Sequence, residues 1–226
     1  MGERKVTLGR SLTRRHATNK SFRSSASTAF LLSLLTCGFS GGHAAQLFEP
    51  NSGESLKKFA ARAIGTQDDI KITKADWNGH PFVFVEYVIS KPIQGGDSEE
   101  DRVLVALEKM PDGTYHKIDV TVGEEEGGTA QVEAITFANA DKDPAKELIV
   151  LLSWPVQHYD VQGILYEVRL FDDIQSEGTE KLTYLNAISE HFNHNTCACA
   201  RRNGKVEHYR FKTVAAIKQE LKRMGN

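Results

Sequence analysis

An acidic segment between two apolar stretches carries side chains suited to binding a cation. Residues 135–137 precede it and residues 148–152 follow it. Its oxygen-bearing side chains recur along the turn at Asn139, Asp141, Asp143 and Glu147. Ca²⁺ takes about six to eight oxygen ligands, and alternate acids in a tight turn can converge on one point. We therefore predict that these four residues bind calcium, with backbone carbonyls and water completing the shell. Asp and Asn also favour turns without any metal, which is the alternative interpretation.

This stretch resembles the calcium loop of FG-GAP and related integrin-type β-repeat proteins, whose pattern is roughly Asp-x-Asp/Asn-x-Asp-Gly-x-x-Asp between two strands. Asp141 and Asp143 match the pattern directly, and Asn139 and Glu147 match it in chemistry. A proline follows Asp143 where the family has glycine. The resemblance covers residues 135–152 in a single copy. It implies a secreted, β-rich binding or structural module, with a calcium affinity near the ~10⁻⁴ to 10⁻³ M of extracellular modules.

A second group of possible metal ligands lies near the C-terminus, at His191, His194, Cys197 and Cys199. Zn²⁺ accepts such nitrogen and sulfur ligands tetrahedrally, so this group could hold zinc. The cysteines could also remain free or redox-active thiols, but in an exported protein we favour a disulfide between Cys197 and Cys199. That bridge would close a three-residue loop. Chain entropy gives it only about 1.6 kcal/mol, so it would stiffen a turn more than it would stabilise the fold.

The elements that must position these residues follow from the apolar pattern. Residues 54–64 form an amphipathic helix that stops at Gly65. Strands are expected at 82–89, 102–108, 115–122, 130–137, 148–153, 163–171 and 206–211, and further helices at 181–192 and 213–221. Short polar links between strands favour an antiparallel meander over βαβ units. We predict a single α+β domain, with a central antiparallel sheet, an N-terminal helix and C-terminal helices.

The first 45 residues predict a signal or targeting segment. Basic residues precede an apolar run at 29–39, and small residues follow it. This order is typical of a secretory signal peptide, here with cleavage after Ala44. The segment ending at Cys37 also resembles a lipobox, so a lipid anchor at Cys37 is an alternative. A twin-arginine signal, a mitochondrial transit peptide and a buried N-terminal helix stay open. We expect an exported protein, periplasmic or secreted, whose mature domain is 46–226.

The charge of the chain limits its partners. All 226 residues carry a formal net charge of −2, with 26% charged and 40% hydrophobic residues. Residues 1–45 hold seven basic residues and one acidic residue, which leaves 21 basic and 29 acidic residues, a net charge of −8, for 46–226. An acidic domain repels phosphate backbones, so we do not expect a nucleic-acid partner. No apolar run reaches the ~18 residues of a membrane span, so no span is expected in the mature chain.

Common sequence signatures of catalysis do not occur in the chain. There is no G-x-S-x-G, P-loop or H-E-x-x-H pattern. Ser153, His158 and Asp160 are neighbours in sequence, but triad members usually come from distant segments, so we expect a loop with a buried Trp154. The leading hypothesis is an exported, non-catalytic domain that binds a protein or glycan, or has a structural role, with a weak calcium loop. The alternative is a metal-binding or thiol-redox protein that uses the histidine and cysteine group.

Overall fold

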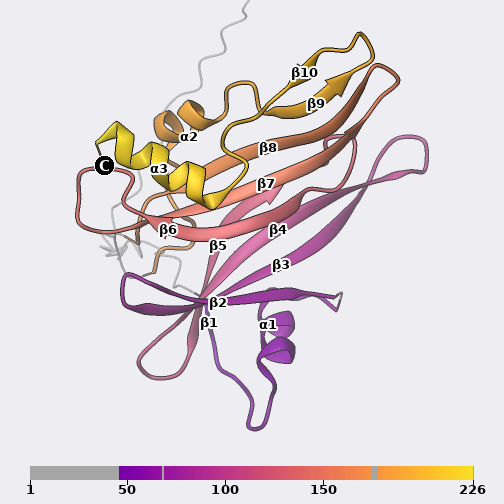
Figure 1. Cartoon of the computed structure of the whole chain (residues 1–226). Coiled ribbons are helices and arrows are strands. Elements are labelled where there is room, and N and C mark those ends of the chain that lie inside the picture. The colour runs from indigo at the N-terminus through magenta and orange to yellow at the C-terminus, as the bar shows by residue number, and fades with distance from the viewer. Residues whose placement is uncertain (1–45, 68, 175–177, 226) are drawn as a thin grey trace, which may run out of the picture. The chain divides into compact units, whose positions relative to one another are not determined.

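Two antiparallel β-sheets and three helices make up the protein over residues 46–67, 69–174 and 178–225, which are the residues that the computed structural model describes (Figure 1). These residues belong to one compact unit. The predicted targeting segment, residues 1–45, lies outside the described residues. Within the described ranges, no helix combines the length and apolar character that crossing a membrane requires.

The first sheet has the strand order β1-β5-β4-β3-β2. Its strands are β1 (Leu47–Phe48), β2 (Lys71–Trp77), β3 (His80–Pro92), β4 (Ser98–Lys109) and β5 (Tyr115–Gly123). Tight turns join β2 to β3, β3 to β4 and β4 to β5. Asn78 and Gly79, which join β2 to β3, both have positive φ, at 53° and 86°. A two-residue hairpin turn of type I′ requires positive φ at both positions. β3, β4 and β5 confirm the predicted strands, whereas β1 and β2 were not predicted.

The second sheet has the order β10-β9-β8-β7-β6. Its strands are β6 (Gln131–Ala138), β7 (Glu147–Gln157), β8 (Val161–Phe171), β9 (Cys197–Arg201) and β10 (Val206–Glu207). β6, β7 and β8 agree with the prediction to within a few residues. β7 also includes Ser153 and Trp154, so the loop predicted there is wrong, although Trp154 is buried as expected. β9 was not predicted.

The helices α1 (Leu56–Ile64), α2 (Asn186–Phe192) and α3 (Val214–Met224) are shorter than or close to their predicted ranges. Ser55 caps α1, because its hydroxyl accepts a hydrogen bond from the Lys58 amide at 3.4 Å. Thr213 caps α3 in the same way, because its hydroxyl accepts a hydrogen bond from the Ala216 amide at 3.3 Å. α2 begins later than predicted because the preceding segment bonds with β5. There the Leu182 amide donates to the Asp119 carbonyl at 3.3 Å.

The prediction of one central sheet is wrong, because the described strands form two sheets with a core between them. The middle of β4 and almost all of β7 are buried without alternation, so each has apolar side chains on both faces. A core cluster that includes Phe84, Leu104, Leu152 and Trp154 fills the space between the sheets. α1 covers the other face of the first sheet, and α2 and α3 cover that of the second (Figure 1). The layers are thus helix, sheet, sheet and helices.

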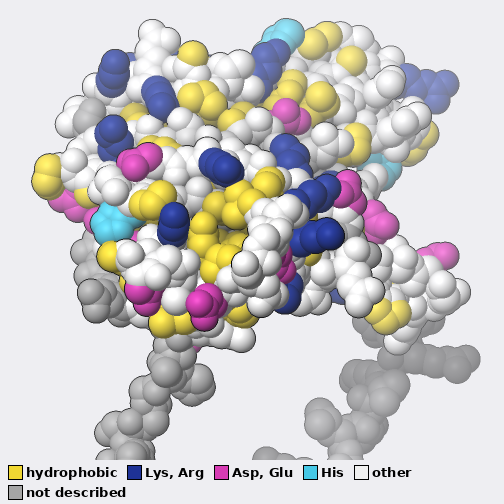
Figure 2. Space-filling view, turned by 90° about the horizontal axis from the view of Figure 1, so that it is seen from below, with side chains coloured by type: hydrophobic (Ala, Val, Ile, Leu, Met, Phe, Trp, Pro, Cys, Tyr) yellow, Lys and Arg dark blue, Asp and Glu magenta, His cyan; other side chains and the backbone are white. Residues whose placement is uncertain are grey.

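α1 covers only part of the outer face of the first sheet. It has nine residues, whereas β3 has 13. Ile72, Tyr87 and Ile89 pack at the margin of the cluster beneath α1 and stay partly exposed. Viewed from below, the molecule shows apolar side chains bordered by Lys and Arg side chains (Figure 2). Part of this view of the surface is therefore apolar and locally basic, although residues 46–226 carry a net negative charge.

Candidate functional site

The meander of the second sheet brings two acidic segments to one edge. β6 and β8 run in the same direction on either side of β7, so both end at the edge where β7 begins. The register shows this directly, because Ala138 pairs with Glu147 and Leu148 pairs with Phe171. The loop after β6 and the segment after β8 must therefore lie next to each other.

Three carboxylates meet at this edge. Asp141 and Asp143 come from the loop after β6, and Asp172 directly follows β8. Each offers one oxygen atom, and these atoms all lie within 4.8 Å of one another. No other set of three His, Cys, Asp or Glu side chains comes together in this way among the described residues. Two of the four predicted calcium ligands are thus brought together, and Asp172 joins them.

Hydrogen bonds to the backbone fix the orientation of these carboxylates. Asp141 Oδ1 accepts from the Asp143 amide at 2.8 Å, and Asp143 Oδ1 accepts from the Ala145 amide at 2.8 Å. Asp172 Oδ1 accepts from the Asp173 amide at 3.0 Å. Aspartate side chains commonly stabilise turns in this way. The loop thus holds its acids in place within the protein itself.

The other two predicted ligands have different surroundings. The Asn139 side-chain amide donates to the Asp143 carbonyl and so braces the loop. Glu147 is 0% exposed, and its Oε2 accepts a hydrogen bond from the Ala140 amide. Glu147 Oε1 is also buried and has no hydrogen-bond partner. Burial, opposed by the Ala140 hydrogen bond and reinforced by the charges of Asp141 and Asp143, raises the pKa of Glu147 to about 7.

The pKa of Asp173 also reflects the excess of negative charge at this edge of the sheet. Its pKa is raised first by burial and then by the charges of Asp143, Asp172 and Asp141. Carboxylates crowded together in this way disfavour one another's ionised forms. A bound cation would reverse that effect, because it favours the charged form of every carboxylate near it.

The acidic loop is also fastened to the first sheet. The Trp77 indole and the Asn78 side chain both donate to the Lys146 carbonyl, the latter at 3.0 Å. The Lys146 amide donates in return to Asn78 Oδ1 at 3.0 Å. The end of the loop therefore connects the β2–β3 turn to the start of β7. An open hollow of about 710 Å³ is lined by the loop, Ile188 and Met224, and it gives access to Asp141 and Asp143.

The predicted zinc ligands are not brought together. His191 lies on α2, and its Nε2 is 2.9 Å from Glu220 Oε1 on α3. Hydrogen bonds from Arg223 and then His191 hold the pKa of Glu220 at about 2. Cys197 and Cys199 lie next to each other in β9 as a disulfide pair, with their Cα atoms 5.3 Å apart. The predicted local disulfide therefore fits the structure, and His191 instead forms a hydrogen bond to Glu220 that joins α2 to α3.

Asp172 and Asp173 were missed by sequence reasoning, although the sequence carries a signal for them. They directly follow the apolar end of the predicted strand at 163–171. In an antiparallel meander every second strand ends at the same edge, so acids after that strand must lie near acids after 130–137. The signal could be used only once the strand order was known.

These observations define a candidate cation site at one edge of a two-sheet protein. Comparison of the chain with family models, curated proteins and solved structures finds no match. The resemblance of the loop to FG-GAP calcium loops stays a prediction.

Proposed function

We propose that this protein is an exported, non-catalytic binding or structural domain in which Asp141, Asp143 and Asp172 hold a calcium ion. The observation that carries the proposal is the meeting of three carboxylates from two separate segments within 4.8 Å. Glu147 stands next to the loop: its Oε2 accepts a hydrogen bond from the Ala140 amide, and its buried Oε1 has no hydrogen-bond partner.

The spacing of the carboxylates suits calcium. Oxygen atoms bind Ca²⁺ at about 2.4 Å, so two ligands of one ion lie at most ~4.8 Å apart. The three aspartate oxygens satisfy that limit without movement of the chain. Ca²⁺ also accepts irregular coordination and several waters, which suits a loop that opens on a hollow. Mg²⁺ requires shorter bonds of about 2.1 Å and near-octahedral geometry, so it fits less well.

The proposed role of the ion is mechanical. It would join the end of β6 to the end of β8, and it would neutralise the aspartate charges that add to the effect of burial in raising the pKa of Glu147 and Asp173. Because Lys146 is bonded to the β2–β3 turn, the same ion would stiffen the contact between the two sheets. Such a site stabilises a binding surface without taking part in a reaction.

Calcium-dependent stability tests this proposal. With a dissociation constant of ~10⁻⁴ to 10⁻³ M, about 10 mM Ca²⁺ should stabilise the protein by roughly 1.4 to 2.7 kcal/mol. For a domain of this size the melting temperature should rise by roughly 3 to 10 °C. Asp172→Asn should abolish the rise, whereas Asp97→Asn, in the exposed β3–β4 turn, should keep it. An unchanged melting temperature of the native protein, or an equal rise in Asp172→Asn, would refute the site.

A further inference from the structure

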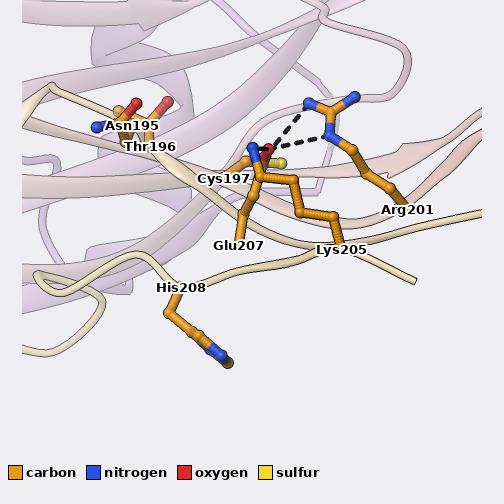
Figure 3. Close-up of a pocket in the computed structure, with 7 residues that line it drawn as sticks. All are labelled: Asn195, Thr196, Cys197, Arg201, Lys205, Glu207 and His208. Carbon is orange, nitrogen blue, oxygen red and sulfur yellow. Dashed lines mark hydrogen bonds and ion pairs between the residues drawn. The ribbon is translucent and has the colours of Figure 1, made fainter. Parts of the chain in front are cut away.

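One cysteine of the disulfide pair in β9, Cys197, lines a pocket on the second sheet, away from the acidic edge. Residues two positions apart in a β-strand point to the same face of the sheet. Cys197 and Cys199 of β9 can therefore pair with each other across Ala198. The pocket has a volume of about 490 Å³, and Cys197, Arg201, Lys205, Glu207 and His208 contribute to its lining (Figure 3). We name it the Cys197 pocket.

The two sulfur atoms differ in access. Cys197 is partly exposed and lines the pocket. Cys199 is 2% exposed and pairs across the sheet with Gly163 of β8. The contact is so close that a Cβ added at Gly163 would lie 2.8 Å from Cys199 Sγ. A reagent that enters the pocket can therefore reach the Cys197 sulfur, whereas β8 shields the Cys199 sulfur.

The pocket carries excess positive charge next to the accessible sulfur. Arg201 Nε and Lys205 Nζ each lie 2.9 Å from Glu207 Oε1, so two cations share one carboxylate. In Figure 3 these three head groups converge beside Cys197. Their net charge of +1 attracts thiolate anions and stabilises a thiolate formed at Cys197, since nearby cations lower the pKa of a cysteine thiol.

We propose that the Cys197–Cys199 pair is a thiol–disulfide exchange site whose substrate is a cysteine-containing polypeptide with acidic residues beside its thiol. The inference does not depend on the calcium site. Two features of β9 favour exchange over a purely structural bridge. The bridge spans only two positions in sequence, so its reduction frees little chain. The strand is also held by its pairing with β8 and β10, which does not require the bridge.

The exchange can be written with all atoms balanced. The substrate thiolate attacks Cys197 Sγ, the Cys197–Cys199 bond breaks, and a substrate–Cys197 disulfide forms. The electron pair of the broken bond leaves with Cys199 Sγ, which takes up the proton lost by the substrate thiol. Cys199 Sγ lies 4.0 Å from the Ile164 carbonyl, which can accept a weak hydrogen bond from the new thiol. A second substrate thiol then attacks the mixed disulfide, which leaves an oxidised substrate and two reduced protein cysteines.

Exchange with synthetic peptides tests the proposal on the full chain. Cys37 is first blocked with iodoacetamide under oxidising conditions. The protein is then mixed with a monothiol peptide flanked by glutamates, and the released thiol is alkylated with a second reagent. Tandem mass spectrometry should find the peptide on Cys197 and the alkyl group on Cys199. The opposite assignment, or no mixed disulfide, would overturn the proposal.

The rate of exchange tests the role of the charge. Loss of one unit charge several ångströms from the sulfur in a water-like medium should slow the reaction about threefold, and Lys205→Gln makes that change. Arg202→Gln is the matched control, because Arg202 lies in the same exposed turn but does not line the pocket. On the unsubstituted protein, a lysine-flanked peptide should react several-fold more slowly than the glutamate-flanked one. Equal rates for both peptides, or for both variants, would show that the pocket does not select its substrate.

Discussion

Glu147 should make the stability of this protein fall as pH rises, and Glu147→Gln should remove that fall. The carboxyl group is fully buried behind the acidic loop, and its pKa is raised to about 7 from an ordinary value of 4.5. The folded protein therefore holds the proton more tightly than the unfolded chain between these values. By linkage, the protonated group contributes stability at low pH, and this contribution is lost as pH rises toward 7.

The size of the effect follows from the difference between the two pKa values. A shift from 4.5 to about 7, at 1.36 kcal/mol per pH unit, amounts to about 3 kcal/mol. Glutamine has the shape of the neutral acid and no proton to lose. Relative to Glu147→Gln, the native protein should therefore lose about 3 kcal/mol of unfolding free energy from about pH 4.5 to about pH 8. Saturating calcium should reduce this loss, because a cation favours the ionised carboxylate.

Urea unfolding followed by tryptophan fluorescence, with EDTA present, measures this difference. Trp77 and Trp154 are both buried in the core between the sheets and report its loss. Glu99→Gln, on an exposed part of β4, is the control and should leave the pH dependence unchanged. If the free energies of the native protein and Glu147→Gln run parallel across the pH range, the reasoning about this buried carboxyl group is wrong.

Two further predictions concern packing. Leu152→Ala removes a side chain that is 1% exposed between the two sheets and should cost about 2 to 5 kcal/mol in urea unfolding, whereas Ile164→Ala, at a site 40% exposed, should cost under about 1.5 kcal/mol. Gly163→Ala places a Cβ 2.4 Å from the Ala198 carbonyl oxygen and 2.6 Å from the Cys199 Cα. Both atoms belong to the β9 backbone, so we expect a loss of about 1 to 3 kcal/mol and faster amide exchange in β9. Unchanged exchange in β9 would contradict the close approach of the two strands.

The strands with continuous apolar runs could be predicted from sequence. The apolar stretch at 148–153 lies within β7, and it could be predicted because so short an apolar run favours a strand buried on both faces over a helix. β2 was missed because it is an edge strand with charged residues among its apolar ones. β9 was missed because Cys and Ala give little strand signal.

The division into two sheets could not be predicted, because the link at 124–130 resembles the other polar loops of the chain. One part of the candidate site could not be predicted either, because it depends on how the strands are arranged. Asp141 and Asp143 lie in one loop and could be predicted together, whereas Asp172 joins them only through the pairing of β6 and β8 with β7. The predicted zinc ligands are close in sequence, but the fold gives them different partners. His191 forms a hydrogen bond to Glu220 of α3, whereas the two cysteines of β9 pair with each other.

The order of strands in each sheet has a consequence for how the protein reaches its native state. Strands β2 to β5 are neighbours in sequence and in space, and so are β6 to β10. Strands β2 to β5 and β6 to β8 can thus grow hairpin by hairpin with short loops to close, whereas β9 joins β8 only after the longer link that contains α2. The pairing of β1 with β5 and the association of the two sheets require distant parts of the chain to find each other. The apolar side chains that the sheets bury against each other would be open to aggregation until then.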